Sequence, residues 1–414
     1  MARFNRVDKA RSSRTVLVRQ IARGRALLGR VLPMIVLLAA CGPNPSEMGL
    51  ERIEAWQTVE QYKIDHRIAT QRVSQWVREP GNEDKSREEA EAALGLEMPD
   101  ALLPVDAALT IATANPVDDL GFMALRFAFY ELRSIDEPDR SEYEDAVYGL
   151  LEAHYINDLR LDRLLLGLIR FGGDRGVDLV DEIVARSTQR LLRARGAFWS
   201  ASERLMDVDD LSKSADERAQ VRAEVMRMAQ LVARQYSDVK VFREQLGGEA
   251  IQPVLYALDN LTVGHEIPEA GAQRIGGDRE LLSQYRGSVL LLDFWATWCV
   301  PCIASLPDIE RLSQMLGEQD FQVITISVDE TIELVEEFME SRADLPYINW
   351  YLGSQSKLYD DWSIQGLPTY IVVDRDGTVR GRSFELETLY EVILEATGAD
   401  PETRSAILGD MAAS

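Results

Sequence analysis

Two cysteines separated by two residues form the most informative chemical motif of the sequence. Cys299 and Cys302, in the order Cys-Val-Pro-Cys, follow the apolar run 288–295 and precede a helical pattern over 303–316. This context places the pair at the N-terminus of a helix, where unpaired backbone N–H groups and the helix dipole stabilise a thiolate. The motif therefore predicts that Cys299 attacks a disulfide as the nucleophile. Cys302 would then resolve the mixed disulfide that this attack produces.

A metal centre is the alternative use of such a cysteine pair. Zinc would need two further Cys or His ligands, but the three histidines, His66, His154 and His265, are scattered along the chain. A c-type haem needs a histidine directly after the second cysteine, and Ile303 stands there. The sequence thus favours thiol chemistry and predicts no metal and no cofactor.

The composition is that of an acidic globular protein with more than one folded unit. The chain has 414 residues and a formal net charge of −24. A chain of this length usually exceeds one hydrophobic core, so several domains are expected. Nucleic acid is not an expected partner, because binding to phosphates needs clustered Lys and Arg side chains.

The first forty residues have the pattern of a secretion signal. A basic stretch precedes the apolar run 31–38, which is too short to span a bilayer as a helix. The run ends in Leu38-Ala39-Ala40-Cys41, which resembles the lipobox of bacterial lipoproteins. The resemblance implies a signal peptide over 1–40, lipid on Cys41 and a tether over 41–46. The alternatives are an ordinary cleaved signal and an uncleaved hydrophobic anchor.

Residues 47–260 show the periodicity of amphipathic helices. Leu50, Ile53, Trp56 and Val59 fall on one face of a helix that should run to Val77. Further helices are expected over 118–132, 141–155, 159–171, 177–192 and 215–236. This part of the chain is predicted to be an all-α helical domain.

From residue 261 the pattern changes to short apolar runs that alternate with helices. The runs 288–295, 321–328 and 369–374 are typical of buried strands, and the Asp-Gly step at 376–377 predicts a hairpin. This order of elements predicts an α/β sandwich around a central mixed β-sheet over 261–400. Residues 401–414 would form a C-terminal tail.

The segment Leu292-Asp-Phe-Trp-Ala-Thr-Trp-Cys-Val-Pro-Cys302 resembles the thioredoxin superfamily, and more closely its TlpA-like membrane-tethered reductases. Pro307 and the segment Gly366-Leu367-Pro368-Thr369 strengthen the resemblance, which implies a thioredoxin-like fold and a cis peptide bond before Pro368. A cis bond there leaves the backbone of Leu367 free to pair with an extended substrate. Trp298, Leu367 and Pro368 are the expected substrate contacts. The alternative is a trans proline that starts an edge strand.

Two acidic residues are further candidates for the chemistry. Asp293 lies six residues before Cys299, where thioredoxins have a buried acid, and a carboxyl group with a raised pKa could take the proton of Cys302. Its alternative role is that of a structural hydrogen-bond acceptor. Glu330 matches a position where some TlpA-like reductases hold an acid near the thiols. An exposed Glu at the start of the next helix explains it equally well.

Together these features predict a thiol–disulfide oxidoreductase, most simply a reductase of disulfides in exported proteins. By resemblance, its electrons would come from a membrane thiol donor, and the lipid would hold it on a membrane facing the periplasm. An oxidising role stays open, because the potential depends on how strongly the Cys299 thiolate is stabilised. A different class of function is an envelope binding or assembly module built on the helical domain, with the redox domain as an accessory.

Overall fold

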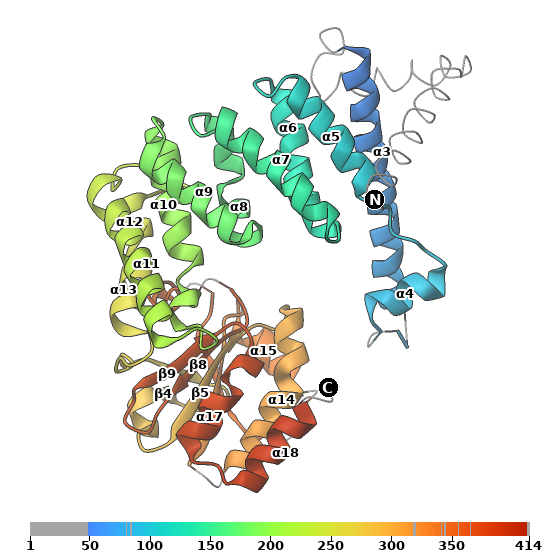
Figure 1. Cartoon of the computed structure of the whole chain (residues 1–414). Coiled ribbons are helices and arrows are strands. Elements are labelled where there is room, and N and C mark those ends of the chain that lie inside the picture. Colours follow the sequence, from blue (N-terminus) through green and yellow to red (C-terminus); the bar gives the residue numbers. More distant parts are fainter. Residues whose placement is uncertain are drawn as a thin grey trace, which may run out of the picture. The chain divides into compact units, whose positions relative to one another are not determined.

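The computed structural model shows the chain as two compact units that divide between Ile156 and Asn157 (Figure 1). The residues that it describes are 49–79, 81–82, 85–317, 320–340, 342, 345–354, 356–364 and 366–411. The expected signal peptide (1–40), Cys41 and the tether (41–46) lie outside the described residues.

The first unit is helical, as the periodicity predicts. The long helix α3 (Leu50–Val77) ends at the expected residue and buries Trp56 and Val59. Helices α6 (Asp119–Glu131) and α7 (Asp139–His154) agree with their expected ranges to within two residues at each end. A 3-10 turn, η2 (Leu132–Ser134), follows α6.

Two helices of this unit were not expected from the periodicity. Helix α4 (Arg87–Leu94) buries only Ala90, so its apolar face is too small to give a period. It starts at a capping box in which Ser86 and Glu89 bond each other's backbone N–H groups, and this motif is readable from the sequence. Helix α5 (Leu102–Ala114) is apolar around most of its circumference because it packs against both α3 and α6.

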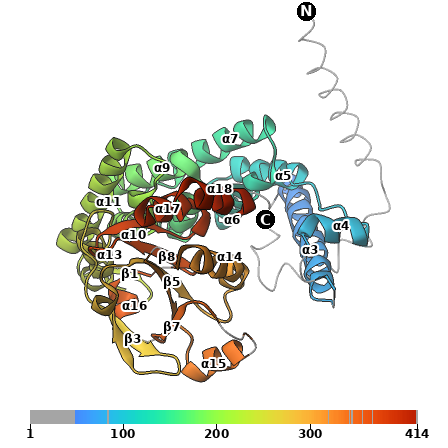
Figure 2. The ribbon, with the colours of Figure 1, turned by 90° about the horizontal axis from the view of Figure 1, so that it is seen from below.

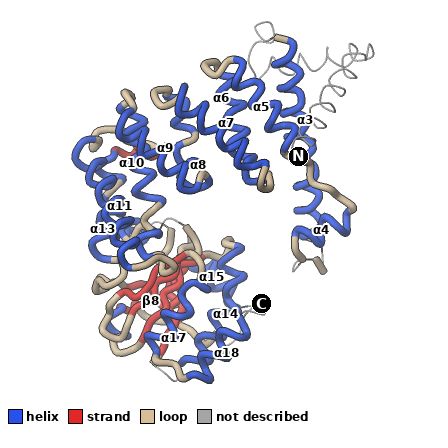
Figure 3. The backbone as a smooth tube through the Cα atoms, in the orientation of Figure 1, coloured by secondary structure: helices blue, strands red, loops and turns tan. Residues whose placement is uncertain are grey.

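The second unit begins with a helical segment. Its elements are η3 (Leu159–Arg163), α8 (Leu165–Phe171), α9 (Gly173–Arg186), α10 (Arg190–Glu203), η4 (Met206–Asp209), α11 (Ala215–Gln235), α12 (Gly247–Ala250) and α13 (Gln252–Asn260). A short hairpin, β1 (Lys240–Phe242) and β2 (Gln245–Leu246), interrupts it. Figure 3 shows the remaining strands gathered in the C-terminal part of the chain.

Two expected helices of this segment are wrong in detail. The range 159–171 is not one helix, because a 3-10 turn, η3, precedes α8. The range 177–192 spans the end of α9 and the start of α10. Between them Ser187 has a ψ of 137°, and its hydroxyl accepts a hydrogen bond from the Gln189 N–H. Both helices bury apolar side chains, so apolar residues recur on either side of this break.

A seven-stranded mixed sheet follows, which confirms the expected α/β sandwich. Its strand order is β4-β3-β7-β6-β5-β8-β9, with β5, β6 and β7 parallel and the other pairs antiparallel. The strands are β3 (Gly271–Arg274), β4 (Arg279–Leu281), β5 (Val289–Trp295), β6 (Phe321–Ser327), β7 (Ile348–Tyr351), β8 (Thr369–Val373) and β9 (Val379–Ser383). All seven residues of β5 are buried, as expected for a central strand. Gly377, with φ 88°, makes the expected turn between β8 and β9.

Helices α14 (Val300–Leu316), α17 (Tyr390–Thr397) and α18 (Pro401–Met411) lie on one side of this sheet (Figure 2). The side chains of Val289 and Leu291 point into the core beneath them, and alternation along the strand puts Asp293 on the same face. Ile407 of α18 is fully buried in this core, so part of the expected tail 401–414 is a packed helix. The remaining helices are α15 (Ile332–Glu340) and α16 (Lys357–Asp361), with 3-10 turns η5 (Leu282–Tyr285) and η7 (Leu386–Leu389).

The helical segment of the second unit is joined to the sheet by buried polar groups. Asp209 at the end of η4 is 3% exposed and accepts a hydrogen bond from the Val263 N–H at 2.9 Å. Arg382 of β9, also 3% exposed, donates to the carbonyls of Trp362 and Ser363. Burial raises the pKa of Asp209 to about 6, while the positive charge of Arg382 opposes that rise. The segment meets the sheet here, since η4 lies against β9 and Leu211, just beyond η4, packs against the core of the sheet domain.

Candidate active site

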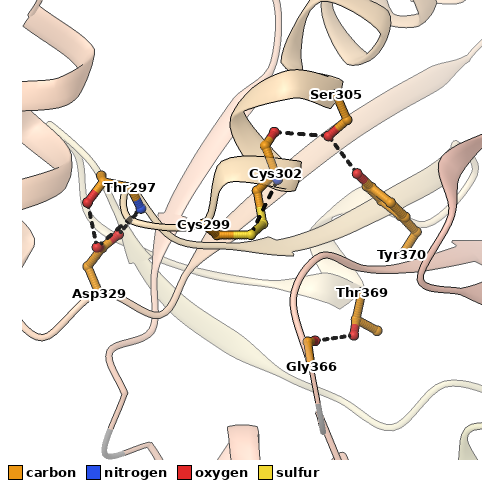
Figure 4. The surroundings of a disulfide bond; sticks show 8 residues. All are labelled: Thr297, Cys299, Cys302, Ser305, Asp329, Gly366, Thr369 and Tyr370. Carbon is orange, nitrogen blue, oxygen red and sulfur yellow. Dashed lines mark hydrogen bonds between the residues drawn. A yellow bond between two sulfur atoms is a disulfide. The ribbon is translucent and has the colours of Figure 1, made fainter. Parts of the chain in front are cut away.

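Cys299 and Cys302 form a disulfide where β5 leads into α14 (Figure 4). Cys299 is the N-cap residue of α14, and its Sγ accepts a hydrogen bond from the backbone N–H of Cys302 at 3.3 Å. This is the helix N-terminus that the sequence predicts. After reduction the same N–H group and the helix dipole would stabilise a thiolate on Cys299.

The disulfide is nearly covered, but the residues that flank it are not. Cys299 is 4% exposed and Cys302 is 1% exposed, whereas Trp298 and Val300 are 67% and 78% exposed. The covered disulfide is thus flanked on both sides of Cys299 by exposed apolar side chains.

The cis-proline segment lies at the same end of the sheet. The Leu367–Pro368 peptide bond is cis, as the resemblance implies. Strand β8 starts at Thr369, opposite Phe294 of β5, and runs antiparallel to it. The start of β8 and the end of β5 that leads to Cys299 are therefore neighbours. The Thr369 hydroxyl donates to the Gly366 carbonyl at 2.7 Å and closes the turn around the proline (Figure 4).

Asp293 is a buried carboxyl group without a hydrogen bond. It is 1% exposed, and neither of its carboxylate oxygens has a partner among the described residues. Burial in an apolar environment disfavours the charged form and raises the pKa of Asp293 to about 8. An acid of this kind can exchange a proton near neutral pH. The alternative role, an acceptor within a structural hydrogen bond, finds no support at this position.

Asp329 is a site residue that the sequence analysis missed. It is fully buried at the end of β6 and accepts hydrogen bonds from the Thr297 N–H, the Thr297 hydroxyl and the Ser327 hydroxyl. Both hydroxyl bonds are 2.8 Å long, and Figure 4 shows the bonds from Thr297. Since Thr297 stands two residues before Cys299, these bonds hold the active-site loop against the sheet. The available signal was that parallel strands β5 and β6 end at the same edge.

Glu330, by contrast, is not brought into the hydrogen-bond network around the disulfide. Its side chain is exposed, and its backbone carbonyl accepts a hydrogen bond from the Tyr351 hydroxyl at 3.0 Å. Helix α15 starts two residues later, at Ile332. The position thus fits an acid ahead of a helix start, and a role of Glu330 near the thiols stays a prediction.

Metal coordination has no support in the described part of the chain. No group of three or more His, Cys, Asp or Glu side chains comes together there in a way that could hold an ion. The two cysteines are bonded to each other.

Comparisons with known proteins agree with this site. Residues 262–389 match the protein-family model Redoxin. The thiol-disulfide oxidoreductase ResA of Geobacillus kaustophilus is 28% identical over 121 residues, which are 29% of this chain and 68% of that protein. ResA of a Bacillus cereus strain is also 28% identical, over 29% of this chain and 69% of its own length.

A solved structure from Chlorobium tepidum, described as a thiol:disulfide interchange protein DsbE, is 26% identical to the chain. It covers 33% of this chain and 98% of its own, with a TM-score of 0.31. The family match falls on the part of the chain that carries the sheet, the cysteine pair and the cis-proline. Residues 262–389 therefore form a Redoxin domain with a thioredoxin-like fold, and the chain is an oxidoreductase.

Proposed function

We propose that the protein is a TlpA-like thiol–disulfide oxidoreductase that reduces disulfides in exported proteins. The observation that carries the proposal is the Cys299–Cys302 disulfide at a helix N-terminus, beside a cis-proline and on a sheet that holds the buried acid Asp293. The name of the relatives, thiol-disulfide oxidoreductase, supports the same reaction class.

The reaction would proceed by two exchanges. The Cys299 thiolate attacks one sulfur of the substrate disulfide, the substrate S–S bond breaks, and one substrate thiolate leaves. Cys302 then loses its proton to Asp293 and attacks Cys299 Sγ. The mixed disulfide breaks and the second substrate thiolate leaves. Cys299 and Cys302 have then passed two electrons to the substrate and form a disulfide with each other. A dithiol donor restores the reduced pair.

The substrate would bind beside the cis-proline as an extended segment. The Leu367 backbone would pair with it, while Pro368 and the exposed ring of Trp298 would contact its side chains. Glu330, whose side chain is exposed, stays a candidate for an acid that acts near the thiols. No dissociable cofactor takes part in this scheme.

The reduction potential of the pair tests the direction of the reaction. Replacing Cys41 with Ser leaves Cys299 and Cys302 as the two cysteines of the chain, because the sequence has three. Equilibration of this variant with dithiothreitol or glutathione buffers is expected to give a potential near or below about −270 mV, the range of a reductant. A value near about −120 mV would instead identify an oxidant and overturn the reductase proposal.

The site of action would be a membrane surface facing the periplasm, held by lipid on Cys41 and supplied with electrons by a membrane thiol donor. Of the helices that the structure describes, none has the length and apolar character needed to cross a bilayer. The motif Leu38-Ala39-Ala40-Cys41 supports lipid attachment instead. Growth with a radioactive fatty acid is expected to label the wild-type chain and not Cys41→Ser. Equal labelling of both would refute the anchor.

A further inference from the structure

The resolving cysteine is tied to the sheet by two hydroxyl groups that have no assigned role. The Tyr370 hydroxyl donates to Ser305 Oγ at 2.7 Å, and the Ser305 hydroxyl donates to the Cys302 carbonyl at 2.9 Å (Figure 4). Ser305 lies one turn beyond Cys302 on α14, and Tyr370 lies two residues beyond Pro368 on β8. This chain of hydrogen bonds therefore joins the cysteine helix to the strand that follows the cis-proline.

This chain of hydrogen bonds starts on the face of the sheet that carries Asp293. Asp293 and Tyr370 are directly opposed in the antiparallel β5–β8 ladder. Side chains opposed in this way lie on the same face with Cβ atoms about 5 Å apart. Both residues are 1% exposed, and Tyr370 belongs to the core beneath α14. Tyr370 thus stands beside the buried acid on this face and reaches α14 through its hydroxyl.

The start of α14 needs such a link because the helix is weakened just beyond it. Pro307 lies inside the helix. A proline has no N–H to donate to the carbonyl four residues before it, and its ring disturbs that carbonyl. The turn that carries Cys302 therefore has fewer bonds to the rest of α14 than a regular helical turn has. The Tyr370 hydroxyl gives this turn one further tie, to β8 of the sheet, and hydrogen bonds in series strengthen one another.

We propose that Tyr370 and Ser305 are positioning residues that hold Cys302 in place above Asp293, so that its sulfur attacks the mixed disulfide in the productive geometry. This inference rests on the proposed function of Cys302 as the resolving thiol and of Asp293 as its proton acceptor. Neither hydroxyl would touch the substrate. Their effect would appear in the second exchange and not in the first.

Stopped-flow reaction of the reduced Cys41→Ser protein with a limiting amount of 5,5′-dithiobis(2-nitrobenzoate) separates the two exchanges. Attack by Cys299 releases the first thionitrobenzoate, and attack by Cys302 on the mixed disulfide releases the second. Loss of a hydrogen bond in the chain is expected to slow the second release about tenfold in Tyr370→Phe and in Ser305→Ala, with the first release unchanged. In the double variant the second release is expected to be no slower than in either single variant, because both hydroxyls act in one chain of hydrogen bonds.

Tyr390→Phe is the matched control. Tyr390 is buried in the same core at 5% exposure, and its hydroxyl has no hydrogen-bond partner within the described residues. Its replacement removes the same atom from the same core and should change neither phase. Ser305→Thr keeps a hydroxyl and should restore the second phase.

Three results would overturn the inference. The first is an unchanged rate of the second phase in both single variants. The second is a double variant in which the slowing equals the product of the two single effects. The third is an equal slowing of the second phase in Tyr390→Phe. The proposed function fails on different evidence: a Cys299→Ser protein that still releases thionitrobenzoate in two steps would remove Cys299 from the mechanism, whatever the Tyr370 variants do.

Discussion

Cys299→Ser is expected to abolish disulfide reduction, lowering the turnover of a protein disulfide roughly 10³-fold or more, because it removes the nucleophile of the first exchange. Cys299 is the cysteine whose sulfur accepts the Cys302 N–H at the start of α14. A serine hydroxyl at this position would stay protonated at neutral pH and would not attack sulfur. The measurement is the rate of insulin disulfide reduction with dithiothreitol as the electron donor.

Cys302→Ser is the informative partner of this variant. It keeps the nucleophile but cannot resolve the mixed disulfide, so a covalent complex with the substrate should accumulate. The complex is measured on non-reducing gels and by mass spectrometry, and dithiothreitol should reduce its mixed disulfide and separate the two proteins. Cys41→Ser, which leaves the pair intact, is the control for both. Wild-type turnover in Cys299→Ser, or a complex formed through Cys302 alone, would contradict the order of attack.

Asp293→Asn is expected to slow the second exchange about 100-fold at pH 7, because it removes the group that accepts the proton of Cys302. The first exchange, which needs only the Cys299 thiolate, should keep its rate. The two phases of thionitrobenzoate release measure this directly. Asp376→Asn, which removes an exposed carboxylate from the β8–β9 turn, serves as the control. A second phase that is equally fast in Asp293→Asn would exclude Asp293 as the proton acceptor.

The same substitution has a pH signature in stability. The pKa of Asp293 is raised by burial to about 8 in the folded protein, against about 3.9 in an unfolded chain. Between these values the folded state binds one proton more than the unfolded state, so the free energy of unfolding falls as pH rises. The contribution is fully present below pH 4 and is lost as pH passes through 8.

In the oxidised protein the difference in unfolding free energy between wild type and Asp293→Asn should therefore change by about 1.4 kcal/mol per pH unit from pH 5 to 7. Burial raises the pKa of Tyr370 and of Tyr347, and the charge of Asp293 raises it further, so both tyrosines stay neutral throughout this range. Urea unfolding followed by tryptophan fluorescence measures the slope. Parallel curves for the two proteins would mean that Asp293 does not titrate between pH 5 and 7.

The local chemistry of the site was accessible from the sequence because it depends on neighbouring residues. A buried strand, Cys-x-x-Cys and a helix start follow one another without interruption, so the N-cap position of Cys299 needs no long-range information. The buried position of Asp293 follows in the same way from the unbroken apolar character of β5. The hairpin after β8 follows from Asp376 and Gly377, because glycine adopts the positive φ of the turn at no steric cost.

Contacts between distant segments were decided only by the tertiary structure. Asp329 bonds Thr297 across 32 positions, and Tyr370 bonds Ser305 across 65, since strand pairing places β6 and β8 on either side of β5. The division between Ile156 and Asn157 falls inside a region of uniform helical periodicity. Period and propensity report which face of an element is buried, but not which partner buries it. Packing of the whole chain selects the partner, and with it the groups that surround the cysteine pair.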